Sequence, residues 1–189
     1  MKPLRDLVTG TVSMICIAAA AVAAQQPPDA SLQPFNRRIA DYVALRRHVE
    51  MQAAPPRVSA TPSDIEAAAD ALAVAIRAAR PDARAGDIFA ADAADLFRRR
   101  IDAALREHGL NAADLVMDIA SEAPRARADL TINGRFDWAF GALMPGCVID
   151  ALPALPVELQ YRFVDGDLVL LDVDAGLIVD VLPRALSTT

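Results

Sequence analysis

The chain has few of the residues from which most catalytic and metal sites are built. Its 189 residues include two histidines, two cysteines and one tryptophan, and its single lysine is Lys2. His48 and His108 fall in different predicted helices, far from Cys147, so we find neither a zinc ligand set nor a Cys–His nucleophile pair. The sequence also lacks a Gly-x-Ser-x-Gly elbow and a phosphate-binding glycine loop. We therefore expect no catalytic residues, no metal and no cofactor.

The scarcity of cysteine and of positive charge also limits the partners. Cys16 belongs to a predicted leader, so Cys147 is the only cysteine of the remaining chain and an intramolecular disulfide is excluded. Cys147 is either a small buried hydrophobic residue or a reactive thiol, and the sequence leaves its role open. With 19 Lys and Arg against 25 Asp and Glu, the net charge is −6. An acidic protein lacks the positive surface that phosphates require, so we expect no nucleic-acid partner.

The N-terminus has the pattern of a secretory signal peptide. Lys2 and Arg5 precede an uncharged apolar stretch at 12–24, which ends in small residues suited to cleavage. We predict a signal peptide at 1–24, a flexible leader at 25–33 and a periplasmic or secreted protein. The alternative is an uncleaved anchor, which would be the protein's only contact with a membrane. The apolar stretch is short for a membrane span, which needs about 20 residues.

Four helices are predicted in the first two thirds of the chain, because apolar residues recur there every three to four positions. Thr61 to Asp64 is a strong helix start, with threonine as the cap, proline in the first turn and an acid to follow. Gly109 is a typical C-cap. The predicted helices run from Phe35 to before Pro55, from Pro62 to Arg80, from Asp92 to His108, and from Asn111 to before Pro124.

The last third predicts a small antiparallel sheet. Residues 130–132 resemble a short strand, and one short helix is expected around 147–152. From Glu158 the chain alternates between the two faces of a meander, with a two-residue turn at Asp165-Gly166. The fold class is therefore α+β: four N-terminal helices followed by a small antiparallel β-meander of three to four strands. We predict a single domain at 34–189, with a helical part at about 34–123 and an irregular segment and meander at about 129–183.

The turns predict the register of the meander. The first turn pairs Val164 with Asp167 and Leu159 with Asp172. A three-residue turn at 174–176 pairs Leu171 with Val179 and Leu170 with Asp180. One face is then purely apolar and is expected to pack on the helices, while the other is mixed. The apolar face carries Val169, Leu171, Val173, Leu177, Val179 and Val181, and the mixed face carries Tyr161, Phe163, Leu168, Leu170, Asp172, Ile178, Asp180 and Leu182.

Five aspartates lie between residues 165 and 180, and they divide into two groups. Asp165, Asp167 and Asp174 sit in or beside turns, where aspartate binds nearby backbone amides. Asp172 and Asp180 lie within strands, where aspartate is disfavoured. They form either a carboxylate pair for metal binding or acid–base chemistry, or a structural pair at the solvated rim or bonded to arginines or loop amides. The structural interpretation is favoured.

Aromatic residues between the glycines and prolines of the irregular segment are the other candidate site. Trp138 and Phe140 either line a ligand pocket or cover one end of the mixed sheet face, which otherwise exposes Tyr161. The candidate ligand-binding residues are Trp138, Phe140, Tyr161, Asp172 and Asp180. The basic run Arg98–Arg100 is interpreted as a solvated helix face, with an anionic partner as the alternative.

Three long segments also resemble a group of uncharacterised exported bacterial proteins: FNRRIADYVALRR, ARPDARAGDIFAADAADLFRRRI and LPALPVELQYRFVDGDLVLLDVDAGLIVD. The resemblance runs from about Phe35 to Pro183. It implies a single exported domain and no particular activity, cofactor or partner. From the residues we expect a non-catalytic binding or interaction domain for an unknown protein or small molecule. The alternative is a hydrolase-like enzyme or metal-binding protein that uses Asp172 and Asp180.

Overall fold

The computed structural model describes residues 29–52, 61–122, 129–141 and 144–186, and the predicted signal peptide at 1–24 lies outside these ranges. Within them the chain is an α+β fold, with helices first and a three-stranded antiparallel sheet last, as predicted. The elements are a 3-10 turn η1 (Ala30–Leu32), α1 (Gln33–Gln52), α2 (Pro62–Ala79), α3 (Ala91–Glu107), α4 (Ala112–Glu122), α5 (Gly146–Ala151), β1 (Leu159–Val164), β2 (Asp167–Asp172) and β3 (Leu177–Leu182).

Helix boundaries follow the local capping chemistry. At the start of α2 the Thr61 hydroxyl accepts a hydrogen bond from the Asp64 N–H, and the Asp64 carboxylate accepts one from the Thr61 N–H, which is a capping box. After α3, Gly109 adopts a φ of +67°, and the Leu110 N–H donates to the Leu105 carbonyl at 2.8 Å. The predicted capped start of α2 and the predicted glycine stop after α3 are therefore confirmed.

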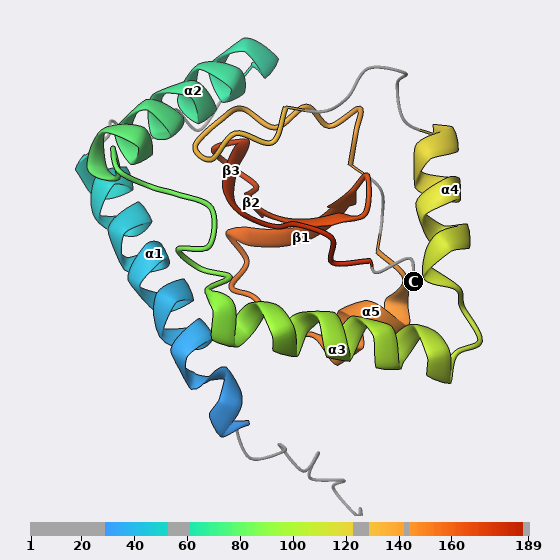
Figure 1. Ribbon diagram of the computed structural model, residues 1–189. Helices are drawn as coiled ribbons and strands as arrows, with labels where there is room; N and C mark the ends of the chain where they lie inside the picture. Colours follow the sequence, from blue (N-terminus) through green and yellow to red (C-terminus); the bar gives the residue numbers. More distant parts are fainter. Residues whose placement is uncertain (1–28, 53–60, 123–128, 142–143, 187–189) are drawn as a thin grey trace, which may run out of the picture.

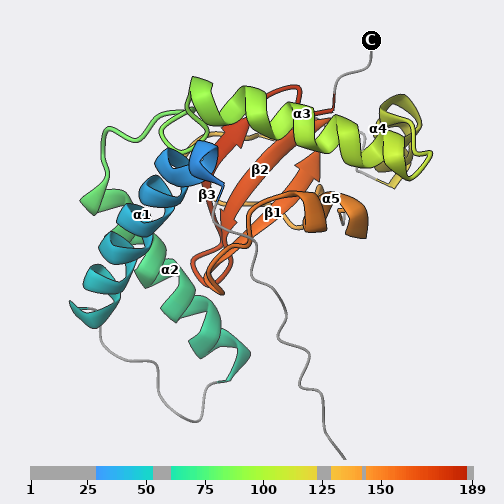
Figure 2. The same ribbon diagram turned by 90° about the horizontal axis from the view of Figure 1, so that it is seen from below.

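The sheet lies at the centre, with helices around it (Figure 1). Helices α1 and α2 pack together at the β3 side, while α3 runs across the strands with α5 beside it (Figure 2). Phe97 of α3 contacts Phe35 of α1 with ring centroids 4.8 Å apart, and contacts Phe89 of the α2–α3 connector at 5.2 Å. Its ring also meets Tyr161 of β1 at 6.0 Å. Helices and sheet thus share one core.

The first hairpin has the predicted register, and the second departs from it. Leu159 pairs with Asp172 and Leu170 with Asp180, as expected. However, Leu171 pairs with Ile178, so the prediction that it faces Val179 was wrong. A β-bulge makes Val179 an extra residue in β3. Leu177 and Ile178, which precede the bulge, therefore lie on the opposite faces from those predicted, whereas Asp180, Val181 and Leu182 keep their predicted faces.

The prediction that the apolar face packs on the helices was also wrong. The mixed face does so, because its acids are bonded to groups supplied by the helical part of the chain, as described below. Most of its side chains join the core of the helices, together with Leu177 and Val179, which were predicted on the apolar face. Ile178, predicted on the mixed face, instead joins the second cluster, which the opposite side of the sheet forms with the irregular segment. The helix-facing residues include Phe163, Leu168, Leu170, Leu177, Val179 and Leu182, and the second cluster comprises Phe136, Val164, Val169, Leu171, Ile178 and Val181, with Leu130, Ile132 and Phe140 packed against it.

The irregular segment lies along the outer edge of β3. The predicted strand at 130–132 does not form, because this stretch is a loop and turn. Pairing starts slightly later: the Asn133 N–H donates to the Ile178 carbonyl at 2.8 Å, and the Ile178 N–H donates to the Gly134 carbonyl at 3.0 Å. This contact covers one edge of the sheet.

The part of the predicted leader that the structure describes belongs to the folded unit. Asp29 caps η1 by accepting from the Ser31 N–H, Leu32 is buried, and Asp29 pairs with Arg100 of α3. Across the described ranges, no helix combines the length and the apolar character needed to cross a bilayer.

Candidate functional site

Asp172 is completely buried at the end of β2. One of its oxygens accepts hydrogen bonds from the Tyr42 hydroxyl at 2.8 Å and from the Arg46 Nε at 3.0 Å, both on α1. The other oxygen accepts from the Ala175 N–H in the following turn at 3.0 Å. Burial raises the pKa of Tyr42, and the charge of Asp172 raises it further, so this phenol stays a donor. Asp172 thus ties α1 to the sheet.

Arg46 supplies the positive charge for this cluster and is itself 2 % exposed. Besides Asp172, its guanidinium pairs with Glu50 at 2.6 Å and with Asp174. Burial lowers the pKa of Arg46, but the three carboxylates raise it by more, so the group stays charged. A buried carboxylate is tolerated here because a cation and two further donors replace its water.

Asp180 is also completely buried, on β3, and its partners are all backbone amides. One oxygen accepts from the Gly86 and Val181 N–H groups at 2.8 Å, and the other from the Ile88 and Phe89 N–H groups at 2.7 Å. Burial raises the pKa of Asp180, and the four N–H groups act in the opposite direction. The carboxylate therefore fixes the α2–α3 connector onto the sheet.

The two strand aspartates are held by an arginine and by loop amides, respectively, and neither lies at a solvated rim. Asp172 faces α1, while Asp180 faces the α2–α3 connector. All four carboxylate oxygens are hydrogen-bonded within the chain. Among the described residues, no three metal-binding side chains (His, Cys, Asp or Glu) come close enough together to hold an ion. Both acids therefore hold the fold together.

Trp138 lies at a surface hollow of about 750 Å³, which we call the Trp138 groove. Its walls are α2, residues 135–138 and the turn at 173–176. The indole is 47 % exposed, and two further apolar side chains in the groove, Ile65 and Val173, are 59 % and 37 % exposed. Three large apolar side chains thus face water in one concavity, which is typical of a binding site.

The rim of the Trp138 groove is acidic. Glu50, Glu66, Asp70 and Asp174 line it together with one arginine, Arg135. Arg135 pairs with Asp70 at 2.8 Å, and Glu50 and Asp174 pair with Arg46. Glu66 has no ion-pair partner among the described residues. The groove therefore presents an excess of negative charge beside exposed apolar surface.

The indole is held in a defined position. Its ring stands edge-on to Phe136, with centroids 5.1 Å apart and an interplanar angle of 89°, and Phe136 is buried beneath it. The guanidinium of Arg162 lies 5.8 Å from the indole centroid. Phe140 is half-buried and packs on the second cluster of the sheet. Trp138 thus lines a hollow, whereas Phe140 covers the apolar face.

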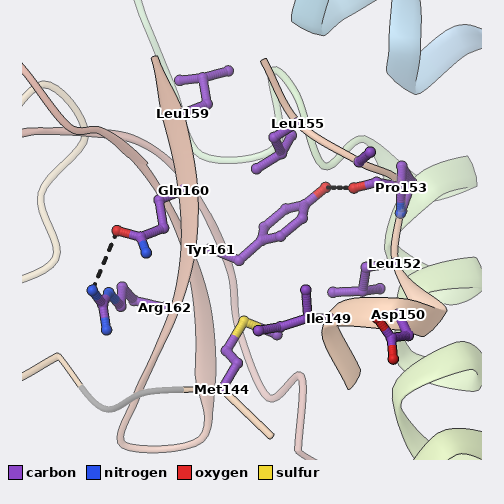
Figure 3. Close-up of a pocket in the computed structure, with 11 residues that line it drawn as sticks. Met144, Ile149, Asp150, Leu152, Pro153, Leu155, Leu159, Gln160, Tyr161 and Arg162 are labelled. Carbon is purple, nitrogen blue, oxygen red and sulfur yellow. Dashed lines mark hydrogen bonds between the residues drawn. The ribbon is translucent and has the colours of Figure 1, made fainter. Parts of the chain in front are cut away.

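Tyr161 lies elsewhere, at a second hollow of about 480 Å³ between β1 and α5, which we call the β1 slot (Figure 3). Its hydroxyl is 3.4 Å from the Pro153 carbonyl, and its ring reaches toward Leu155. Burial raises the pKa of Tyr161. The five candidate residues therefore do not form one site: two acids are internal, Phe140 is packing, and the two remaining aromatics line separate hollows.

The other reactive or charged groups are used within the fold. Cys147 is half-buried on α5 and is a free thiol. In the basic run of α3, Arg98 donates to the Pro183 carbonyl and Arg100 to the Ala151 carbonyl. His108 lies 3.0 Å from the Ala104 carbonyl through Nδ1.

The sequence analysis missed the members of the Trp138 groove that come from α2. Ile65 sits in the first turn of an apolar helix, so the pattern alone places it with the core residues Leu72 and Ile76. Glu66 is one of many acids. These two residues differ from ordinary helix residues only in lying at the same groove as Trp138, which comes about seventy residues later in the chain.

A comparison with protein-family models, curated proteins and solved structures finds no match to this chain. The resemblance to exported bacterial proteins therefore stays a prediction.

Proposed function

We propose that this chain is an exported, non-catalytic binding protein whose ligand lies in the Trp138 groove. The observation that carries the proposal is the half-exposed indole, packed edge-on against Phe136, in a hollow of about 750 Å³ with two exposed aliphatic neighbours. Ligand sites usually measure about 300–1,000 Å³ and combine apolar walls with a few polar groups. Export is supported by the N-terminal pattern of charge, apolar stretch and small residues.

The walls favour a ligand with an apolar body and a cationic head. The apolar body would pack on Trp138, Ile65 and Val173. The cationic head would meet Glu66 and the face of the indole, since tryptophan is the best aromatic partner for a cation. Among the described residues, the groove is lined by no histidine, cysteine, serine, threonine or lysine. This lining supports binding rather than covalent chemistry.

The emission of the lone tryptophan gives a direct test. We expect phenethylammonium to cause a saturable change in Trp138 fluorescence, and the neutral analogue phenethyl alcohol to bind at least about twofold more weakly, since a cation over an aromatic ring contributes about 0.5–2 kcal/mol. Glu66→Gln should reduce this preference and leave the part that comes from the indole. Glu107→Gln is the matched control, because Glu107 is an exposed glutamate on α3, outside the groove.

Two results would contradict the proposal. One is iodide quenching of Trp138 that matches a buried indole. The other is equal binding of phenethylammonium, of phenethyl alcohol and of a third analogue that carries a carboxylate in place of the ammonium group. The export part is tested separately, by the mass of the N-terminus of protein recovered from outside the cytoplasm.

A further inference from the structure

The β1 slot runs along the free edge of the sheet. Four consecutive residues, Leu159 to Arg162, line it. Because successive side chains of a strand point to opposite faces, a hollow lined by all four must follow the edge of the strand. The inner edge of β1 is paired with β2, so the slot lies along its outer edge (Figure 3).

The backbone of β1 has groups directed into this slot. Asp165 and Gly166 form a two-residue turn with positive φ angles of 49° and 88°. In such a hairpin the residues that flank the turn exchange hydrogen bonds, and every second residue does the same. Arg162 therefore bonds to β2, while the N–H and C=O groups of Tyr161 point outward into the slot. Phe163 does not line the slot and is 0 % exposed, so an added strand would bond to the main chain of β1 at Tyr161. Within the described ranges, no other segment takes these outward groups.

The wall opposite β1 is mostly apolar. It consists of α5 and residues 152–155, with Met144 at one end. Ile149 is 55 % exposed there, and the Tyr161 ring extends toward this wall (Figure 3). A strand laid along β1 would place alternate side chains on this apolar side.

The other side of the slot carries an unneutralised cation. Arg162 makes no ion pair among the described residues, and its Nε is buried without a hydrogen-bond partner. One terminal nitrogen donates to the Gln160 side chain at 3.3 Å. Side chains directly opposite on adjacent strands contact one another on the same face. The residue opposite Arg162 is therefore expected to be an acid, whose carboxylate would accept from a guanidinium that lacks one.

We propose that the outer edge of β1 binds an extended peptide of the pattern apolar–Asp/Glu–apolar, as an added fourth strand. The acid faces Arg162, and the apolar residues on either side of it face Tyr161 and Ile149. Main-chain hydrogen bonds to the edge strand supply affinity, and the alternate side chains supply specificity. This site goes beyond the proposed function, because its peptide lies along the outer edge of β1, whereas the Trp138 groove lies between α2 and the turn at 173–176. The two sites meet where the Arg162 guanidinium lies 5.8 Å from the Trp138 indole centroid.

The test uses two capped peptides, acetyl-TVEVT-amide and acetyl-TVKVT-amide, and the mature chain labelled with ¹⁵N. We expect the glutamate peptide to shift the Tyr161 amide signal and to slow its hydrogen exchange, and to bind at least about tenfold more tightly than the lysine peptide. Arg162→Gln should abolish this difference. Arg99→Gln, an exposed arginine on α3 outside the slot, should leave it intact.

Three outcomes would overturn the inference: no protection of the Tyr161 amide at saturating peptide, equal binding of the two peptides, or protection that arises without peptide and grows with protein concentration. The last would show that a second copy of the chain, and not a peptide, occupies the edge. The comparison of peptides on the unaltered protein stands even if Arg162→Gln fails to fold.

Discussion

Replacing Arg46 with methionine removes its guanidinium while keeping an apolar side chain of similar length. The Asp172 carboxylate, which is 0 % exposed, then retains only the Tyr42 hydroxyl and the Ala175 N–H. Removing one partner of a buried ion pair costs about 3–5 kcal/mol, because the other charge stays buried. Since two neutral donors remain, we expect the free energy of unfolding to fall by about 3 kcal/mol.

A double-mutant cycle separates this charge effect from lost packing. Asp172→Asn alone should cost about 1–3 kcal/mol, as Arg46 keeps Glu50 and Asp174. In Arg46→Met/Asp172→Asn neither member of this buried pair carries a charge, so the combined loss should be smaller than the sum of the single losses by at least about 1.5 kcal/mol. Urea unfolding at pH 7, followed by circular dichroism, measures all four proteins.

The control is Arg106→Met, which breaks an exposed pair with Asp102 on α3 and should cost at most about 0.5 kcal/mol. A loss under about 1 kcal/mol for Arg46→Met, or additivity within about 0.5 kcal/mol, would refute the role of Arg46 as the counter-charge of a buried acid.

The other buried acids give two further expectations. Asp180→Ala removes the acceptor of four amides, so hydrogen exchange at Gly86, Ile88 and Phe89 should accelerate at least about tenfold. Asp167→Ala, at a half-buried acid that begins β2 and accepts from the Arg184 N–H, should not change it; unchanged protection in Asp180→Ala would rule out the anchoring role. Bonding to Arg47 lowers the pKa of Glu158 below its ordinary 4.5, so its stabilisation is present above that value and is lost as the pH falls through the lower, folded-state pKa. The stability difference between the protein and Glu158→Gln should therefore be seen at pH 7 and shrink as the pH falls below 4.5, and a difference that stays constant in acid would argue against it.

Local signals predicted most of the fold. The capping box at Thr61, the glycine stop at Gly109 and the Asp165-Gly166 turn each depend on a few neighbouring residues. Because the two-residue turn sets the pairing, the whole register of the first hairpin was correct. The short helix α5 was also placed correctly.

Errors arose where the outcome depended on distant partners. The bulge at Val179 shifts the pairing of Leu177 and Ile178 with β2 by one residue, and no residue of the preceding turn predicts this shift. The helix-facing side of the sheet was misassigned because Asp172 and Asp180 looked too polar for a core. Their hydrogen-bond donors lie on α1 and on the α2–α3 connector, roughly a hundred residues earlier. The presence of a polar residue in a strand does not indicate where in the sequence its donor lies. The Trp138 groove was missed for the same reason, because one of its walls comes from α2, far from Trp138 in the sequence.

The anchoring of the α2–α3 connector by Asp180 has a practical consequence. Asp180 accepts only from main-chain groups, so it specifies the path of the connector without specifying its side chains. Arg84 and Ala85, just before the bonded amides, are exposed. A cysteine introduced at either position would carry a dye or a cross-linker on a rigid mount, and would report ligand-induced motion of the helices relative to the sheet.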